Sequence, residues 1–323
     1  MAVDINRALR KRLPMPPCEG PQLKPFRHFR KIEFLKLLSC DPLSEECATG
    51  SGYVFDVRID KERFALKMFR FYDAADARYD FSWPSPRKIS DETLAFHSDP
   101  FFAECRAYGR INQYYEDLAN KTLRSKYRQR YGKIRLPAVP CYGYTTLPAE
   151  FESSLRKRFR VSEWDRPERE VSKQAKRQPF RCLVKKLIDS RVSILNPRRM
   201  LADLKQLRKL GIYTRDIHAR NYKDGLLVDF SIAWTKPHWC MEAMGPYQRG
   251  GVLQRELVMF DNMIEYEEVK TTVRASRNTY YCFKLRTYGP PDDDDEEEEE
   301  DDDDDDDEND KGSEQSCHYS QDM

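Results

Sequence analysis

The chain has 323 residues, of which 39% are hydrophobic and 34% are charged, so it can bury one sizeable core. No apolar run approaches the length of a membrane span, and the nine cysteines form neither CxxC pairs nor a zinc-binding spacing. These features argue against a membrane protein and against a zinc module. They indicate reduced thiols in a cytosolic or nuclear protein.

The charge is divided unevenly along the chain. Residues 292–323 hold 20 acidic residues and one lysine, which leaves 35 acidic and 55 basic residues in 1–291. The body therefore carries about +20 and the tail about −19. A tail of this composition is expected to be disordered. It is either a solvated terminus or an interaction segment that competes with nucleic acid or binds basic proteins.

A β-hairpin is the first clear element. Residues 53–59 and 63–69 are rich in β-branched and aromatic side chains and flank a polar turn. Alternation in the second arm places Lys67 on the face opposite Phe64, Leu66 and Met68. The next segment, 71–98, shows no periodicity and is predicted to be a loop.

Two helices are predicted from their first residues. Asp99-Pro100 begins a helix that carries Glu104 within an otherwise apolar stripe. Asn196-Pro197 begins a leucine-rich helix that ends at Gly211. Strands are expected at 139–144 and 182–188.

Lys67 and Glu104 are predicted to form an ion pair. Each would be costly to bury alone, and pairing removes both costs. In protein kinases such a pair positions the phosphates of ATP. The alternative is that either side chain reaches solvent.

The strongest motif lies between Thr214 and Ser231. An Arg-Asp pair ending at Asp216, an asparagine five residues later at Asn221, and a short apolar run leading into Asp229-Phe230 resemble the catalytic and metal-binding segments of protein kinases. That resemblance implies that Asp216 is catalytic and that Asn221 and Asp229 hold the metal. Thr214 and Ser231 replace the usual His and Gly. The alternative is a hairpin with no metal.

Other expected kinase features are weaker. Gly50 and Gly52 precede Lys67 and are candidate phosphate-binding residues, although two nearby glycines are more often just a turn. No Ala-Pro-Glu follows Ser231, and about sixty residues remain before Pro290, so the platform for a peptide substrate is expected to be missing.

No single histidine or cysteine suggests a further site. His218 has no identifiable partner in the sequence, and His97, His238 and Cys240 suggest neither a triad nor a metal site. Two basic clusters, 120–135 and 152–179, suit either contact with nucleic-acid phosphates or solvated insertions.

The ordered set of motifs resembles the fungal Fta-two family, a subunit of the inner-kinetochore complex named Sim-four. That resemblance implies a protein-kinase-like fold in a nuclear protein of the centromere and kinetochore. The segments that carry it are 23–35, 54–60, 64–67, 99–109, 141–144, 211–217, 221–222, 228–231 and 233–234.

We therefore expect an α+β, protein-kinase-like fold with a small β-rich N-lobe, a reduced helical C-lobe and a disordered acidic tail. The expected divisions are a flexible basic N-terminus at 1–22, a kinase-like domain at 23–289 whose lobes meet near residue 188, and the tail at 290–323.

Two functions stay open at this stage. The first is a kinetochore subunit that binds partner proteins at centromeric chromatin, and that contacts DNA or nucleosomes through the basic insertions, with residual Mg-ATP binding. The second is an active atypical protein kinase or small-molecule phosphotransferase that uses Mg-ATP. In either case the nucleotide would be bound by Lys67, Glu104, Gly50 and Gly52.

Overall fold

All the described residues of this computed structural model belong to one unit of the chain, residues 1–282. They are residues 22–39, 50–80, 89–124, 136–161, 163–167, 177–190 and 192–276. Outside them lie residues 1–21 of the expected N-terminal lead-in, the acidic tail, residues 125–135 of the first basic cluster, and residues 162 and 168–176 of the second.

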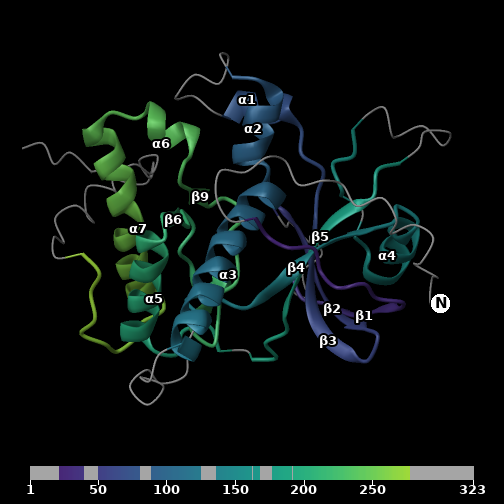
Figure 1. Cartoon of the computed structure of the whole chain (residues 1–323), viewed down its shortest axis with the longest axis horizontal. Coiled ribbons are helices and arrows are strands. Elements are labelled where there is room, and N and C mark those ends of the chain that lie inside the picture. The colour runs from purple at the N-terminus through teal and green to yellow at the C-terminus, as the bar shows by residue number, and fades with distance from the viewer. Residues whose placement is uncertain are drawn as a thin grey trace, which may run out of the picture. The chain divides into compact units, whose positions relative to one another are not determined.

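A five-stranded antiparallel sheet of order β1-β2-β3-β5-β4 forms one layer (Figure 1). The predicted hairpin is confirmed as β2 and β3, and both strands expected farther along the chain are present as β4 and β5. The strand bounds are β1 Ile32–Leu37, β2 Gly52–Ile59, β3 Glu62–Phe69, β4 Cys141–Leu147 and β5 Phe180–Lys186.

The two faces of the sheet bury different cores. Phe64, Leu66 and Met68 of β3 pack in one apolar cluster, as their alternation predicts, together with α4, Phe151–Phe159. Trp164 belongs to the same cluster. The described part of the second basic cluster therefore packs on the sheet through its apolar side chains, while its charged side chains lie mainly at the surface.

Both predicted helix starts are confirmed. The Asp99 carboxylate accepts a hydrogen bond of 2.9 Å from the Phe101 amide at the start of α3, Pro100–Arg124. Asn196 caps α5, Pro197–Lys209, by accepting from the Arg199 amide at 3.1 Å. Gly211 has a φ of +73°, the left-handed conformation that favours glycine after a helix.

The prediction of a loop at 71–98 is wrong. Residues Ala74–Asp80 form α1, and Asp91–Ser98 form α2. Each helix has only about two turns, so an apolar stripe has too few positions to show as periodicity. Ser90 caps α2 at the Thr93 amide, and the fully buried Leu94 anchors it.

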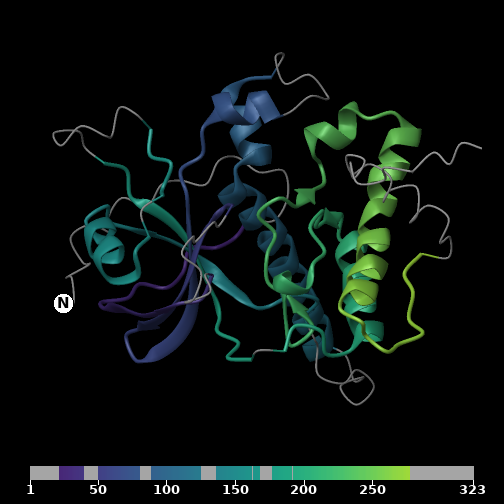
Figure 2. The ribbon, with the colours of Figure 1, turned by 180° about the vertical axis from the view of Figure 1, so that it is seen from behind.

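The helical part lies on the other side of α3. Figures 1 and 2 show α3 between the sheet and the helices α5 and α7, Pro246–Tyr266, and one apolar cluster joins α3, α5 and α7. Short strands β6 (Ile212–Tyr213), β7 (Tyr222–Lys223), β8 (Leu226–Leu227) and β9 (Trp234–Thr235) and the helix α6 (Trp239–Ala243) complete it. Over the part of the chain described, no helix combines the length and apolar character of a membrane span.

Candidate functional site

A buried ion network lies between the sheet and the helical part. The Lys67 ammonium on β3 lies 2.9 Å from the Glu104 carboxylate on α3 and 2.8 Å from Oδ1 of Asp229. The Lys67 and Glu104 side chains are 3% and 0% exposed. The ion pair predicted from the sequence is therefore formed, and Asp229 joins it.

Lys185 is a second buried lysine of this network that the sequence analysis missed. It lies on β5, and its ammonium donates to the other oxygen of Glu104 and, at 2.7 Å, to the Val228 carbonyl. Its neighbour Lys186 is exposed. Two adjacent lysines in a sequence give no sign of which one is buried. On a strand they lie on opposite faces, and here Lys185 lies on the same face as the buried Leu183.

The network shifts the pKa values of Asp229 and Lys67. Burial alone would raise the pKa of Asp229, but the charges of Lys67 and Lys185 lower it far below its usual range. Burial opposes the charged form of Lys67, yet Asp229 and Glu104 together raise its pKa above the ordinary value. Both groups are therefore ionised at neutral pH, and both charges act on any ligand that enters the site.

The predicted catalytic residue Asp216 lies in the loop after β6. Its carboxylate accepts from the Asn221 amide at 2.9 Å and from the Arg220 guanidinium at 3.2 Å, and His218 Nε2 lies 3.2 Å from Oδ1. The expectation that His218 has no partner is wrong. Its partner is Asp216, two residues earlier in the same loop. A loop has no regular spacing from which such a contact could be predicted.

Glu256 of α7 fixes the start of this loop. Its buried carboxylate accepts from the Thr214 amide, from the Thr214 hydroxyl at 2.8 Å and from the Arg215 amide at 3.3 Å. Arg215 has a φ of +60° and lies over the Trp234 ring. Thr214, which replaces the usual His, thus has a structural role. Glu256 was missed because most of its bonds go to backbone amides, which leave no mark in a sequence.

The two candidate glycines differ in their surroundings. A Cβ atom on Gly52, which has a φ of +151°, would lie 2.2 Å from the Met68 carbonyl oxygen. The close approach of β3 therefore requires glycine there. A Cβ on Gly50 would meet no atom within 4 Å. Both glycines line the cleft described next, and residues 40–49, which precede Gly50 in the sequence, lie outside the described residues.

Lys67, Lys185, Asn221 and Asp229 border one cleft of about 450 Å³, and Glu104 lies behind it, bonded to both lysines. Apolar side chains including Val54, Ala65 and Leu187 also line it. Asp216 is joined to it through Asn221. This is the arrangement of a protein-kinase-like α+β fold. It brings together a strand lysine (Lys67), a helix glutamate (Glu104), the Asp216 loop and the Asp229-Phe230 segment.

A magnesium ion would have two protein atoms to bind. Oδ1 of Asp229 is used by Lys67 and by the Ser231 amide at 2.8 Å, and the Asn221 amide nitrogen is used by Asp216. The other carboxylate oxygen of Asp229 and the amide oxygen of Asn221 remain, and both are atoms that magnesium accepts. Among the described residues no cluster of three His, Cys, Asp or Glu suits a metal.

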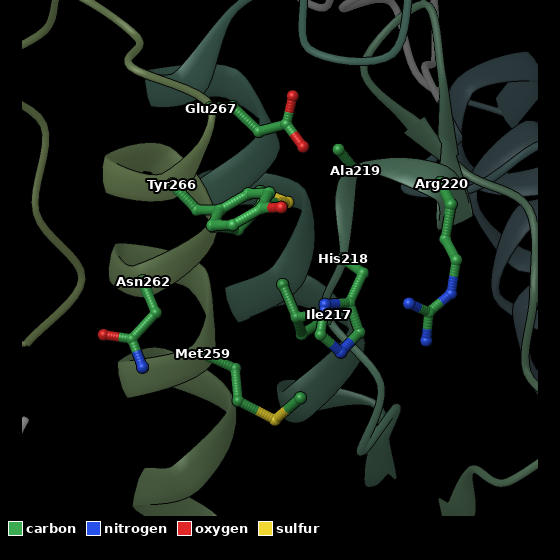
Figure 3. Close-up of a pocket in the computed structure, with 9 residues that line it drawn as sticks. Ile217, His218, Ala219, Arg220, Met259, Asn262, Tyr266 and Glu267 are labelled. Carbon is green, nitrogen blue, oxygen red and sulfur yellow. The ribbon is translucent and has the colours of Figure 1, made fainter. Parts of the chain in front are cut away.

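A second pocket, of about 470 Å³, lies between the Asp216 loop and α7. Figure 3 shows Met259 and Tyr266 reaching from α7 toward Ile217 and His218 on the facing loop. Tyr266 is 86% exposed. The pocket is thus an open, largely apolar surface directly beside Asp216.

His97 and His238 pack against each other. Their ring centres are 4.7 Å apart, and His97 Nδ1 lies 2.9 Å from the Arg106 guanidinium. Burial and the charge of Arg106 lower the pKa of His97 to about 3. Arg106 also donates to the Thr235 carbonyl at 2.7 Å, so the cluster ties α3 to β9.

Comparison with known proteins gives one family, reported below, and similar solved structures. No curated protein matches the chain. Among solved structures, it is similar to the structure of vaccinia related kinase 3, with 12% identity, a TM-score of 0.30, and coverage of 71% of this chain and 54% of that one. The chain thus spans about half the length of that structure.

A model of the family Kinetochore Sim4 complex subunit FTA2 matches residues 12–123 and 133–234. These segments make up about two thirds of the sequence and contain every residue of the ion network and of the Asp216 loop. The chain therefore belongs to the Kinetochore Sim4 complex subunit FTA2 family, a family of the centromere and kinetochore.

Proposed function

We propose that this kinase-fold kinetochore subunit acts by binding partner proteins at centromeric chromatin, and that its cleft retains the ability to bind a nucleotide. Family membership supports partners among the kinetochore proteins. The cleft lined by Lys67, Asn221 and Asp229 supports nucleotide binding. The bonding of Asp216 favours binding over catalysis. Arg220, Asn221 and His218 already surround its two oxygens, so few lone pairs are left for an acceptor hydroxyl.

The pocket beside Asp216 is the proposed partner site. Its occupant would be another protein subunit of the kinetochore assembly that inserts an apolar side chain between Met259 and Tyr266. An exposed aromatic side chain next to methionines is typical of a binding surface, since both give large contact area at low entropic cost. One wall of the pocket is the Asp216 loop, which would be the catalytic loop in a kinase. A bound partner and a phosphate acceptor would therefore compete for the same loop.

Replacing Tyr266 with Asp tests the partner site. The side chain is exposed, so the fold should stay intact, while a carboxylate in an apolar contact should weaken binding by about tenfold or more. The measurement is assembly with recombinant Sim4-complex subunits by size-exclusion chromatography. Tyr247→Asp is the matched control, because Tyr247 is 93% exposed at the other end of α7. Equal assembly of both variants would overturn the proposed surface.

An active phosphotransferase is the second candidate. It is favoured by the convergence of Lys67, Glu104, Asn221 and Asp229 on one network and cleft. In that case Asn221 and Asp229 would hold magnesium, which supplies neutralising charge to the phosphates, while Glu104 orients Lys67.

Labelled ATP separates the two candidates. The phosphotransferase predicts transfer of its terminal phosphate to protein or to a small acceptor, with a loss of at least about a hundredfold in Asp216→Asn. The partner-binding proposal predicts no transfer by either protein and unchanged assembly of Asp216→Asn. Transfer by the wild type that the substitution abolishes would overturn it in favour of the enzyme.

A further inference from the structure

Two ammonium groups lie at the back of the cleft. In the register of β3 and β5, Lys67 lies opposite Leu183 and Ala65 opposite Lys185, so the two lysines share one face of the sheet. Lys67 is 2% exposed and Lys185 is 5% exposed. The kinase resemblance accounts for Lys67 alone. Lys185 is an additional fixed charge in a region of low dielectric, where its field is strong.

The carboxylates of the network are already bound to cations. Glu104 gives one oxygen to each lysine, and Asp229 gives Oδ1 to Lys67 and to the Ser231 amide. A divalent cation would therefore enter a site whose negative charge is neutralised and whose nearest neighbours include two ammonium groups. Their repulsion opposes metal binding and favours an anion.

The rest of the cleft has the same sign of charge. Its lining adds the basic residues Lys186, Arg220 and Lys223. Against these five cations stand three carboxylates, those of Glu104, Asp229 and Asp216, the last paired with Arg220. Only Asp229 of the three lines the cleft itself, so the described lining together with Glu104 and Asp216 behind it carries an excess of two positive charges before any ligand binds.

We propose that the cleft binds the phosphates of a nucleoside triphosphate through these fixed cations, with Lys185 as the decisive one, and does not require a divalent metal. The inference rests on the nucleotide-binding part of the proposed function. A volume of about 450 Å³ and apolar walls at Val54, Ala65 and Leu187 suit a purine base. Lys185 and its neighbours supply the positive charge that a kinase takes from magnesium.

Titration calorimetry with ATP on the full chain tests the proposal. Wild-type protein in EDTA should bind ATP with an affinity within about threefold of that in excess magnesium. Lys185→Met should weaken binding in EDTA by about tenfold, the size expected for a lost charge-assisted hydrogen bond. Lys185→Arg should restore most of it.

Two further variants separate charge from folding. Lys223→Met removes a cleft cation at a partly exposed position, so it should weaken binding in EDTA without unfolding the protein. Lys205→Met removes an exposed lysine of α5 away from the cleft and should change nothing.

The outcomes separate metal-independent binding, which is the inference, from nucleotide binding in the cleft, which is its premise. ATP binding that appears only with magnesium overturns the inference and leaves nucleotide binding standing. No ATP binding under either condition overturns both. Equal affinities for wild type, Lys185→Met and Lys223→Met in EDTA also overturn the inference, because the bound phosphates would then not be held by these charges.

Discussion

Glu104 is the residue on which the ion network depends. It is fully buried and lies between the ammonium groups of Lys67 and Lys185, so it balances charge that no solvent reaches. Removing one partner of a buried ion pair costs more than the pair contributes, because the remaining charge stays buried without compensation. A neutral side chain at this position should therefore destabilise the whole fold.

The substitution Glu104→Gln is expected to lower the free energy of unfolding by about 3–5 kcal/mol. Urea unfolding followed by circular dichroism measures the change. Glu116→Gln is a control on the same helix, because Glu116 is about half exposed and pairs with the exposed Lys24. Its expected cost is at most about 1 kcal/mol. Equal costs at the two positions would show that Lys67 and Lys185 lose their charge or reach solvent.

At the scale of the elements, the sequence predicted most of the structure that surrounds the site. The hairpin of β2 and β3, the start of α3 after Asp99 and the capped start of α5 each have a local cause that a sequence displays: alternation, or a capping side chain followed by proline. Because Lys67 and Glu104 lie on such elements, their contact could be predicted.

The contacts that escaped prediction have no local cause. Glu256 accepts from the Thr214 amide although it lies on a helix some forty residues later. In the sequence, Lys185 cannot be told from its exposed neighbour Lys186, and only the pairing of β5 with β3 shows which lysine is buried. Tertiary contact, which residue patterns do not encode locally, decided both of these features. The short helices α1 and α2 escaped for another reason: their starts carry capping side chains, Asp73 and Ser90, but each helix is too short for an apolar stripe to show as periodicity.

At the scale of the whole molecule, the division of charge supports the proposal that the chain contacts DNA. Residues 1–291 carry about +20, and residues 292–323 carry about −19. We expect a body with this excess of Lys and Arg to attract the phosphates of DNA, with release of counterions. The acidic tail would then be a competing polyanion attached to the same chain, at an effective concentration that a separate DNA molecule does not reach.

Removal of residues 292–323 should therefore tighten DNA binding. At about 150 mM salt we expect the shortened chain to bind a short duplex at least about tenfold more tightly than the full chain, with a steeper dependence on salt. Fluorescence anisotropy measures both quantities. A full-length variant whose tail has Asn and Gln in place of the 20 acidic residues should behave like the shortened chain, because charge and not length causes the competition. If all three proteins bind DNA equally, the tail does not cover the basic surface, and its charge acts on solubility alone.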